Sequence, residues 1–111
     1  MERLCFSFEI NPGTGDEYDR MHREIWPELA DAIREAGYRN YSLFRNDTSV
    51  ICACECHPDA ATAQRLMAER HQALTERWNE AMAPFIVRDA DGNDRRTMYP
   101  PCWHLDDEPR A

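Results

Sequence analysis

The order of two hydrophobic periodicities is the feature that most limits how this chain can fold. Apolar side chains recur at every second position over residues 3–10, which predicts a strand with one buried face. A helical pattern follows to about Ala36, with an interruption near Pro27, because proline lacks an N–H and disfavours a helical residue before it. Two further strands are predicted over residues 38–45 and 49–56, joined by a tight turn.

The second half of the chain continues the scheme. Residues 59–83 are rich in strong helix formers and predict helix in two pieces, divided near Arg70 and His71. Asp59 is placed to cap the first piece, as Thr14 or Asp16 is for the earlier helix. Helix C-termini favour glycine, so Gly37 is expected to end the first helical region.

A polar, mobile loop is expected over residues 88–97, and the last strand is expected over 102–105. Residues 106–111 are expected to be a frayed tail or an extension of that strand. The resulting order is β-α-β-β-α-β, which is typical of a ferredoxin-like α+β domain with helices on one face of an antiparallel sheet. We expect a single domain over residues 1–111. Residues 49–56 are apolar on both faces, which predicts that both are buried, one of them in a dimer.

Composition narrows the choice of partners and compartment. The net charge is −8 and there is no lysine, which argues against nucleic acid and anionic membranes as partners. No apolar run reaches the roughly 20 residues of a membrane-spanning helix, and the first ten residues resemble a strand rather than a signal peptide. The five cysteines are expected to be reduced thiols, which predicts a cytoplasmic location.

Neither of two metal-like patterns has the spacing that a metal site needs. Cys52, Cys54 and Cys56 alternate along one strand, whereas zinc ligands are usually separated by two to four residues. We therefore expect small buried hydrophobes there, with any further role left open. Residues 89–94 lack the full ligand pattern and the closing glutamate of a calcium loop. No metal is predicted.

The chemistry is expected around residues 16–29. Tyr18 and His22 are four residues apart, which puts a phenol and an imidazole on one helical face. An imidazole titrates near neutrality, so His22 could donate and accept protons on a small polar ligand. The bend at Trp26 and Pro27 would form a pocket wall beside this pair.

Other aromatic residues allow two interpretations. Tyr18 and Tyr41 could be core residues or could orient a polyol through their hydroxyls. Trp78 could be a core anchor or a stacking surface for the apolar face of a sugar ring. Trp26 and Trp103 are assigned to the core or an interface.

These motifs resemble the L-rhamnose mutarotase family over almost the whole chain. The string Tyr-x3-His-x2-Ile-Trp-Pro-Glu-Leu at residues 18–29 is the most specific part. The other matching pieces are residues 10–12, Gly37, 40–44, 77–78, 82–83 and 103–106.

The resemblance implies a homodimeric α+β barrel that interconverts the anomers of a free 6-deoxy-L-aldose without a cofactor. By the family pattern, His22 would be the proton donor, and Tyr18, Tyr41 and Trp78 would contact the sugar. The family often has a tryptophan pair, but here the second position is Asn79, also assigned to substrate binding. This departure leaves the sugar open, with L-rhamnose first and L-fucose or a related aldose as alternatives.

The sequence leaves two alternative functions open and does not identify the second acid–base group. A small monooxygenase or haem-degrading enzyme can use the same barrel, with His104 or His71 as haem ligand. A non-catalytic sugar-binding dimer is the other alternative. The second acid–base group beside His22 is open, with Tyr18 as the first candidate and Tyr41 as the second.

Overall fold

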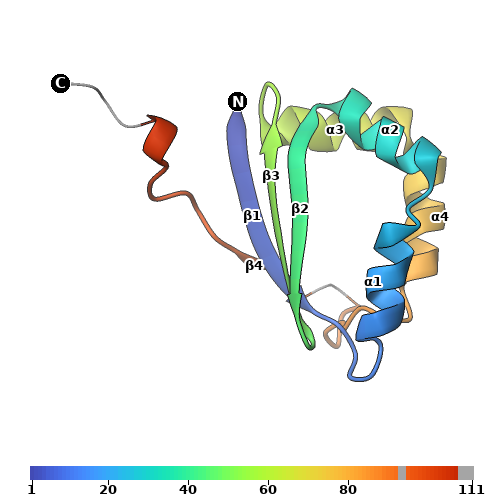
Figure 1. Ribbon diagram of the computed structural model, residues 1–111. Helices are drawn as coiled ribbons and strands as arrows, with labels where there is room; N and C mark the ends of the chain where they lie inside the picture. The colour runs from blue at the N-terminus through green and yellow to red at the C-terminus, as the bar shows by residue number, and fades with distance from the viewer. Residues whose placement is uncertain (93–94, 108–111) are drawn as a thin grey trace.

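A computed structural model describes residues 1–92 and 95–107, and its elements follow the predicted order (Figure 1). These elements are β1 (Glu2–Glu9), α1 (Gly15–Arg23), α2 (Pro27–Ala36), β2 (Tyr38–Asn46), β3 (Ser49–Cys56), α3 (Ala60–Arg70), α4 (Gln72–Met82), β4 (Thr97–Met98) and a 3-10 turn, η1 (Leu105–Asp107). None of the helices in this described part is long and apolar enough to cross a membrane.

The strands form one antiparallel sheet in the order β2-β3-β1-β4, which is the ferredoxin-like arrangement. The four α-helices cover one face of this sheet (Figure 1). Phe6, Cys52 and Leu43 stand opposite one another on β1, β3 and β2 and share the face toward the helices. The predicted α+β fold class is therefore confirmed.

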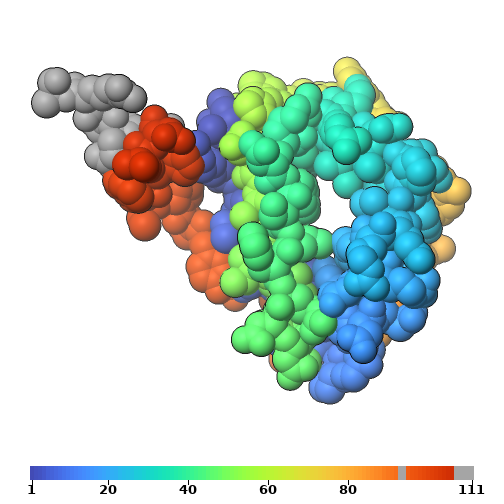
Figure 2. Space-filling view, in the orientation of Figure 1, coloured from blue at the N-terminus to red at the C-terminus, as the bar shows by residue number. Residues whose placement is uncertain are grey.

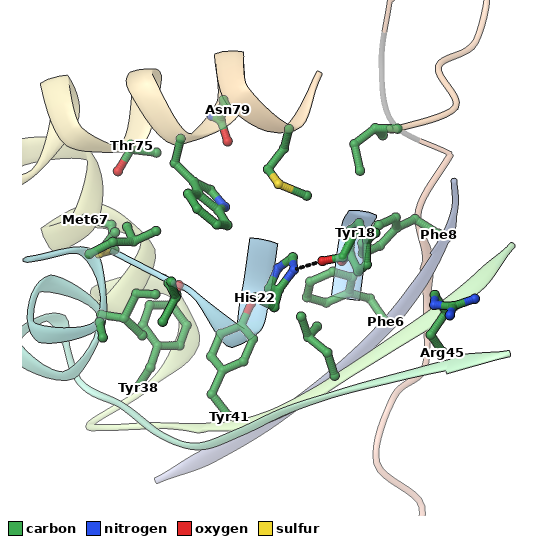
Figure 3. A pocket seen from close by; sticks show the side chains of 18 of the residues that line it. Phe6, Phe8, Tyr18, His22, Tyr38, Tyr41, Arg45, Met67, Thr75 and Asn79 are labelled. Atoms are coloured by element: carbon green, nitrogen blue, oxygen red, sulfur yellow. Dashed lines mark hydrogen bonds between the residues drawn. The ribbon is translucent and has the colours of Figure 1, made fainter. Parts of the chain in front are cut away.

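β2 contains a bulge that changes which side chains face the helices. Between the pairs Arg39–Glu55 and Ser42–Ala53, β2 has two residues where β3 has one. Asn40, within the bulge, has a φ of 49°, which asparagine tolerates better than most residues. As a result Tyr41, like Leu43 beyond it, lies on the helix side of the sheet (Figure 3).

The helix boundaries agree with most of the local signals. α1 ends before Pro27, which is the first residue of α2, and the second helical region divides at His71. The Asp59 carboxylate accepts a hydrogen bond from the backbone N–H of Thr62 at 2.7 Å. The prediction that Thr14 or Asp16 caps α1 is wrong, because no side chain caps this helix. The Thr14 hydroxyl instead donates to the backbone carbonyl of Asn11 at 2.6 Å.

The predicted last strand at residues 102–105 is wrong. The fourth strand is β4, which pairs with β1 at Ser7 and Phe6. The N–H of the next residue, Tyr99, still donates to the Cys5 carbonyl at 2.9 Å, but Pro100 and Pro101 have no N–H to continue the ladder. Thr97 therefore belongs to a strand rather than to the predicted loop, and Trp103 is 63% exposed.

The remaining expectations for the C-terminal part concern residues that the structure describes only in part. Positions 93–94 of the predicted loop and 108–111 of the predicted tail lie outside the described residues. Before the loop, Ile86 forms an isolated bridge with Ile10, and the Val87 N–H donates to the Glu9 carbonyl at 3.0 Å. This contact extends the sheet edge beyond β1 and was not predicted.

The core lies between the sheet and the helices in two clusters. One contains Ile10, Tyr18, Val50 and Met82, and the other contains Cys54, Cys56, Ala60 and Ala63. The alternating cysteines are thus buried as small hydrophobic residues, as expected. The outer face of β3 is different, because Ile51 is 43% exposed. The single chain does not test whether this face is buried in a dimer, so that part of the expectation stays a prediction.

Candidate active site

A cavity of about 930 Å³ lies between the helix-facing side of the sheet and helices α1, α2 and α4. Figure 2 shows its opening between β2 and the two N-terminal helices. The five predicted site residues all line it, namely Tyr18, His22, Tyr41, Trp78 and Asn79. They come from α1, β2 and α4, so the fold brings together three segments that are distant in the sequence.

His22 is held in one orientation by its own helix. Its Nδ1 lies 3.0 Å from the backbone carbonyl oxygen of Tyr18, one turn earlier (Figure 3). A carbonyl oxygen only accepts hydrogen bonds, so this contact requires the proton on Nδ1. In the neutral ring, the Nε2 atom is then a proton acceptor. In the charged ring, the same atom is a proton donor.

Aromatic rings surround His22. The Tyr18 ring lies 4.5 Å from the imidazole between centroids, and the Trp78 ring meets it edge-on at 5.5 Å. Trp26 packs edge-on against Trp78 at 5.1 Å, so it holds this wall from behind. Trp78 is partly buried against the core and also lines the cavity, which combines its two predicted interpretations. Such a wall can accept the apolar face of a sugar ring.

The tyrosine hydroxyls in the cavity remain protonated at neutral pH. Burial raises the pKa of Tyr18 well above its ordinary value. Burial, with Cys52 beside the hydroxyl, also raises the pKa of Tyr41. The pKa of Tyr38, whose ring lies 5.7 Å from that of Tyr41, rises to about 12 for the same reason. These groups can donate hydrogen bonds but are poor bases, which disfavours a phenolate partner for His22.

Asp19 and Arg45 form an ion pair that joins α1 to the sheet beside the cavity. The Arg45 Nε and Nη2 atoms donate to the two carboxylate oxygens of Asp19 at 2.8 and 2.7 Å. Arg45 also donates to the backbone carbonyl of Asp47 at 2.7 Å. The hydrogen bonds from Arg45 lower the pKa of Asp19, so the pair positions the helix that carries His22 while the carboxyl stays charged.

Asp19→Asn is expected to lower the stability of the protein near pH 7. The loss of stability is expected to be smaller in acid. Because the pKa of Asp19 is lower in the folded state, its contribution is present above the ordinary value of about 3.9 and is lost as the pH falls through the folded value. Urea unfolding of both proteins between pH 3 and pH 7 measures this. If the difference in urea midpoint between wild type and Asp19→Asn stays constant over this pH range, the charge of Asp19 does not stabilise the fold. Asp31→Asn is the control, because its contact with Arg34 is 3.4 Å long and exposed.

The sequence missed several residues of the cavity. Arg96 reaches in from the segment before β4, with its guanidinium carbon 4.3 Å from the Phe6 ring centroid. Thr75 and Met67 line the cavity from α4 and α3. Thr75 precedes Trp78 and Asn79 by three and four residues, and this helical spacing is the signal that could have identified it.

The predicted haem ligands do not line this cavity. His71 contacts the Glu35 carboxylate at 2.7 Å, and His104 lies beside a second, shallow pocket near Tyr99 and Trp103. Among the described residues, no group of three or more histidine, cysteine or acidic side chains is arranged to hold a metal ion. The histidine that lines the cavity is His22.

Comparison with known proteins gives one family. The family model described as L-rhamnose mutarotase matches residues 3–105. L-Rhamnose mutarotase from Burkholderia ambifaria (strain MC40-6) is 51% identical over 95% of this chain and 99% of its own length. The protein of that name from Paraburkholderia phytofirmans is 50% identical over 95% and 96%.

A solved structure shows the same fold. The crystal structure of L-rhamnose mutarotase from Formosa agariphila aligns with a TM-score of 0.76 at 20% identity and covers 95% of this chain and 99% of that one. With the match of the family model and the curated relatives over nearly their full length, the conclusion is that this chain belongs to the L-rhamnose mutarotase family.

Proposed function

We propose that this protein interconverts the α and β anomers of a free aldose, with L-rhamnose as the expected substrate. The observation that carries the proposal is the orientation of His22. Its Nδ1 is engaged by the Tyr18 carbonyl at 3.0 Å, beside an aromatic wall that suits a sugar ring. The family and the names of the relatives support the same reaction.

Anomerisation requires only two proton transfers and a bond rotation. The C1 hydroxyl loses its proton, the C1–O5 bond breaks, and O5 gains a proton to give the open-chain aldehyde. Rotation about C1–C2 and reclosure in the reverse sense produce the other anomer. In this proposal the His22 imidazole exchanges these protons, with water or a phenol as the second group. Since the phenols stay protonated, Tyr18 and Tyr41 would act as donors that orient the sugar. The chemistry requires no cofactor.

The proposal is tested by saturation-transfer NMR of anomer exchange. The panel contains L-rhamnose, L-fucose, L-mannose and their D enantiomers. We expect exchange to be faster with the protein than without it, and fastest for L-rhamnose or a closely related L-aldose. Binding without faster exchange would support a sugar-binding protein instead. Asn79 lines the cavity where the family often has tryptophan, so Asn79→Trp tests whether this position changes the order of preference.

We also propose that the functional unit is a homodimer formed through the outer face of the sheet. Phe44 and Ile51 stand opposite each other on β2 and β3 and are 63% and 43% exposed. The C-terminal segment leaves this side of the molecule (Figure 1) and exposes Trp103 and Leu105. Exposed apolar side chains of this size are expected to be covered by a partner, and a second copy is the simplest partner.

Phe44→Asp is expected to raise the dimer dissociation constant at least about tenfold, because a charge would be buried in the interface. Sedimentation equilibrium measures the change. Phe44→Leu keeps an apolar side chain and is the matched control, expected to remain dimeric. A wild-type protein that is monomeric at every concentration tested would contradict the proposal.

The five cysteines are free thiols in the structure. Thiols persist in a reducing environment, so we propose a cytoplasmic location.

A further inference from the structure

The charges around the cavity are opposite in sign to the net charge of the chain. The sequence has 21 acidic residues against 13 arginines and no lysine. Among the described residues, those that line the cavity include one acid, Asp19, and six arginines, namely Arg23, Arg34, Arg39, Arg45, Arg88 and Arg96. A concave surface of one sign attracts ligands of the opposite charge. A neutral sugar gives no reason for this concentration of positive charge.

Part of this charge is balanced within the protein and part is not. Arg45 is paired with Asp19 as described above. Arg39, by contrast, donates to the backbone carbonyls of Arg34 and Tyr38 at 2.6 and 2.7 Å. A backbone carbonyl accepts a hydrogen bond but has no formal charge. These two contacts therefore hold the guanidinium of Arg39 in place and leave its positive charge beside the cavity.

Arg96 brings positive charge to the floor of the cavity. Its guanidinium carbon lies 4.3 Å from the Phe6 ring centroid, within the range of a cation–π contact. Phe6 points into the cavity from β1, and His22 points into it from α1 (Figure 3). Burial raises the pKa of Tyr38, another lining residue, to about 12, and the charge of Arg96 opposes this rise. Arg96 is also exposed, so a ligand can reach it.

The arginines indicate the chemical class of a ligand. A guanidinium holds its N–H donors in a planar fork that matches the two oxygens of a carboxylate or a phosphate. On an aldose this group cannot be at C1, because a substituent there prevents ring opening. At C6 it leaves C1 and O5 free to react. An aldose with an acidic group at C6 would meet His22 with its anomeric carbon and the floor of the cavity with its anion.

We propose that the cavity also takes anionic aldoses, whose C6 carboxylate or phosphate is bound by Arg96 while the anomeric carbon lies at His22. This inference rests on the proposed function and adds a second class of substrate to it. The reaction is the same exchange of anomers, so it requires no further reactant. A 6-deoxy sugar has a methyl group at C6 and would bind without the ion pair.

Five sugars that share one ring configuration and differ only at C6 test this proposal. They are L-rhamnose, L-mannose, L-mannuronate, the uncharged amide of L-mannuronate, and L-mannose 6-phosphate. Anomer exchange is measured by saturation-transfer NMR at pH 7, where the carboxylate is ionised. The amide keeps the shape of the carboxylate without its charge. We expect kcat/KM to be about tenfold higher for L-mannuronate than for the amide. L-Mannose 6-phosphate shows which of the two anions is preferred.

Arg96→Gln removes the positive charge and keeps a side chain that can donate hydrogen bonds. We expect it to lower the preference for L-mannuronate over the amide about tenfold, which leaves little preference. Arg95→Gln is the matched control, because it removes the same charge from the neighbouring residue, which is not among those that line the cavity. Its preference should stay within twofold of wild type. Raising the ionic strength from about 0.01 to 1 M should also reduce the wild-type preference.

Calorimetric binding of L-mannuronate separates this proposal from the proposed function. If the protein accelerates exchange of L-rhamnose, but the charged sugars neither bind nor exchange better than the amide, the anion site is wrong and the mutarotase proposal stands. If L-mannuronate binds tightly to wild type and weakly to Arg96→Gln, but no sugar exchanges faster, the anion site stands and the mutarotase proposal fails. Equal losses of preference in Arg95→Gln and Arg96→Gln would overturn the role of Arg96, because net charge alone would explain them.

Discussion

His22→Asn is expected to fold and to bind sugar, but to lose anomer exchange by about 10²- to 10⁴-fold in kcat. The asparagine Nδ2 takes a position close to that of the imidazole Nδ1, so it can still donate to the Tyr18 carbonyl, which now lies 3.0 Å from the ring. The atom that is lost is Nε2, which faces the ligand in the proposed mechanism. Exchange measured by NMR with L-rhamnose in excess reports the loss.

His22→Gln is the companion variant. Its terminal amide is nearer the position of Nε2, so it can hydrogen-bond the sugar but cannot carry a proton between C1 and O5. We expect it to bind as well as wild type and to be as slow as His22→Asn. Exchange in both variants within tenfold of wild type would show that His22 is not the acid–base group.

Gly37→Ala is expected to destabilise the fold by at least about 3 kcal/mol, the largest effect expected of an alanine substitution at any glycine of the chain. Gly37 ends α2 with a φ of 113°, which L-residues rarely adopt. A Cβ at this position would lie 2.1 Å from the backbone carbonyl oxygen of His57, so backbone would have to move. The Gly37 carbonyl also accepts the His57 N–H at 2.9 Å, which joins the start of β2 to the end of β3.

Gly13→Ala is the matched control, because Gly13 also has a positive φ, of 82°, but nothing within 4 Å of a new Cβ. It should cost only the backbone strain, about 1 kcal/mol. Denaturant unfolding of the two variants separates strain from the clash. Equal losses would show that the contact with His57 adds nothing.

Local signals predicted much of this molecule. The alternation in residues 3–10, the break before Pro27 and the division at His71 are properties of neighbouring residues, and all three are confirmed. Predicting the site required residues that lie far apart in the sequence. His22 and Tyr18 were identified by their spacing on one helix, while Tyr41 and Trp78 came from the family pattern and do line the same cavity.

The features that were predicted wrongly, or not at all, also have physical reasons. A strand was expected at residues 102–105, although Pro100 and Pro101 end the ladder just after Tyr99. The concentration of arginines around the cavity could not be read from the sequence, because it depends on which side chains the fold brings together.

The bulge in β2 has a consequence for how the chain length can vary. Side chains of a regular strand share a face only at even separations, yet Tyr38 and Tyr41 face the same cavity at an odd separation of three. The extra residue between Arg39 and Ser42 sets this parity. Deleting Asn40 would keep both tyrosines in the chain and turn one of the two rings to the opposite side of the sheet. Insertions and deletions in β2 are therefore tolerable only in pairs, so the length of this strand is as much a part of the sugar pocket as its side chains.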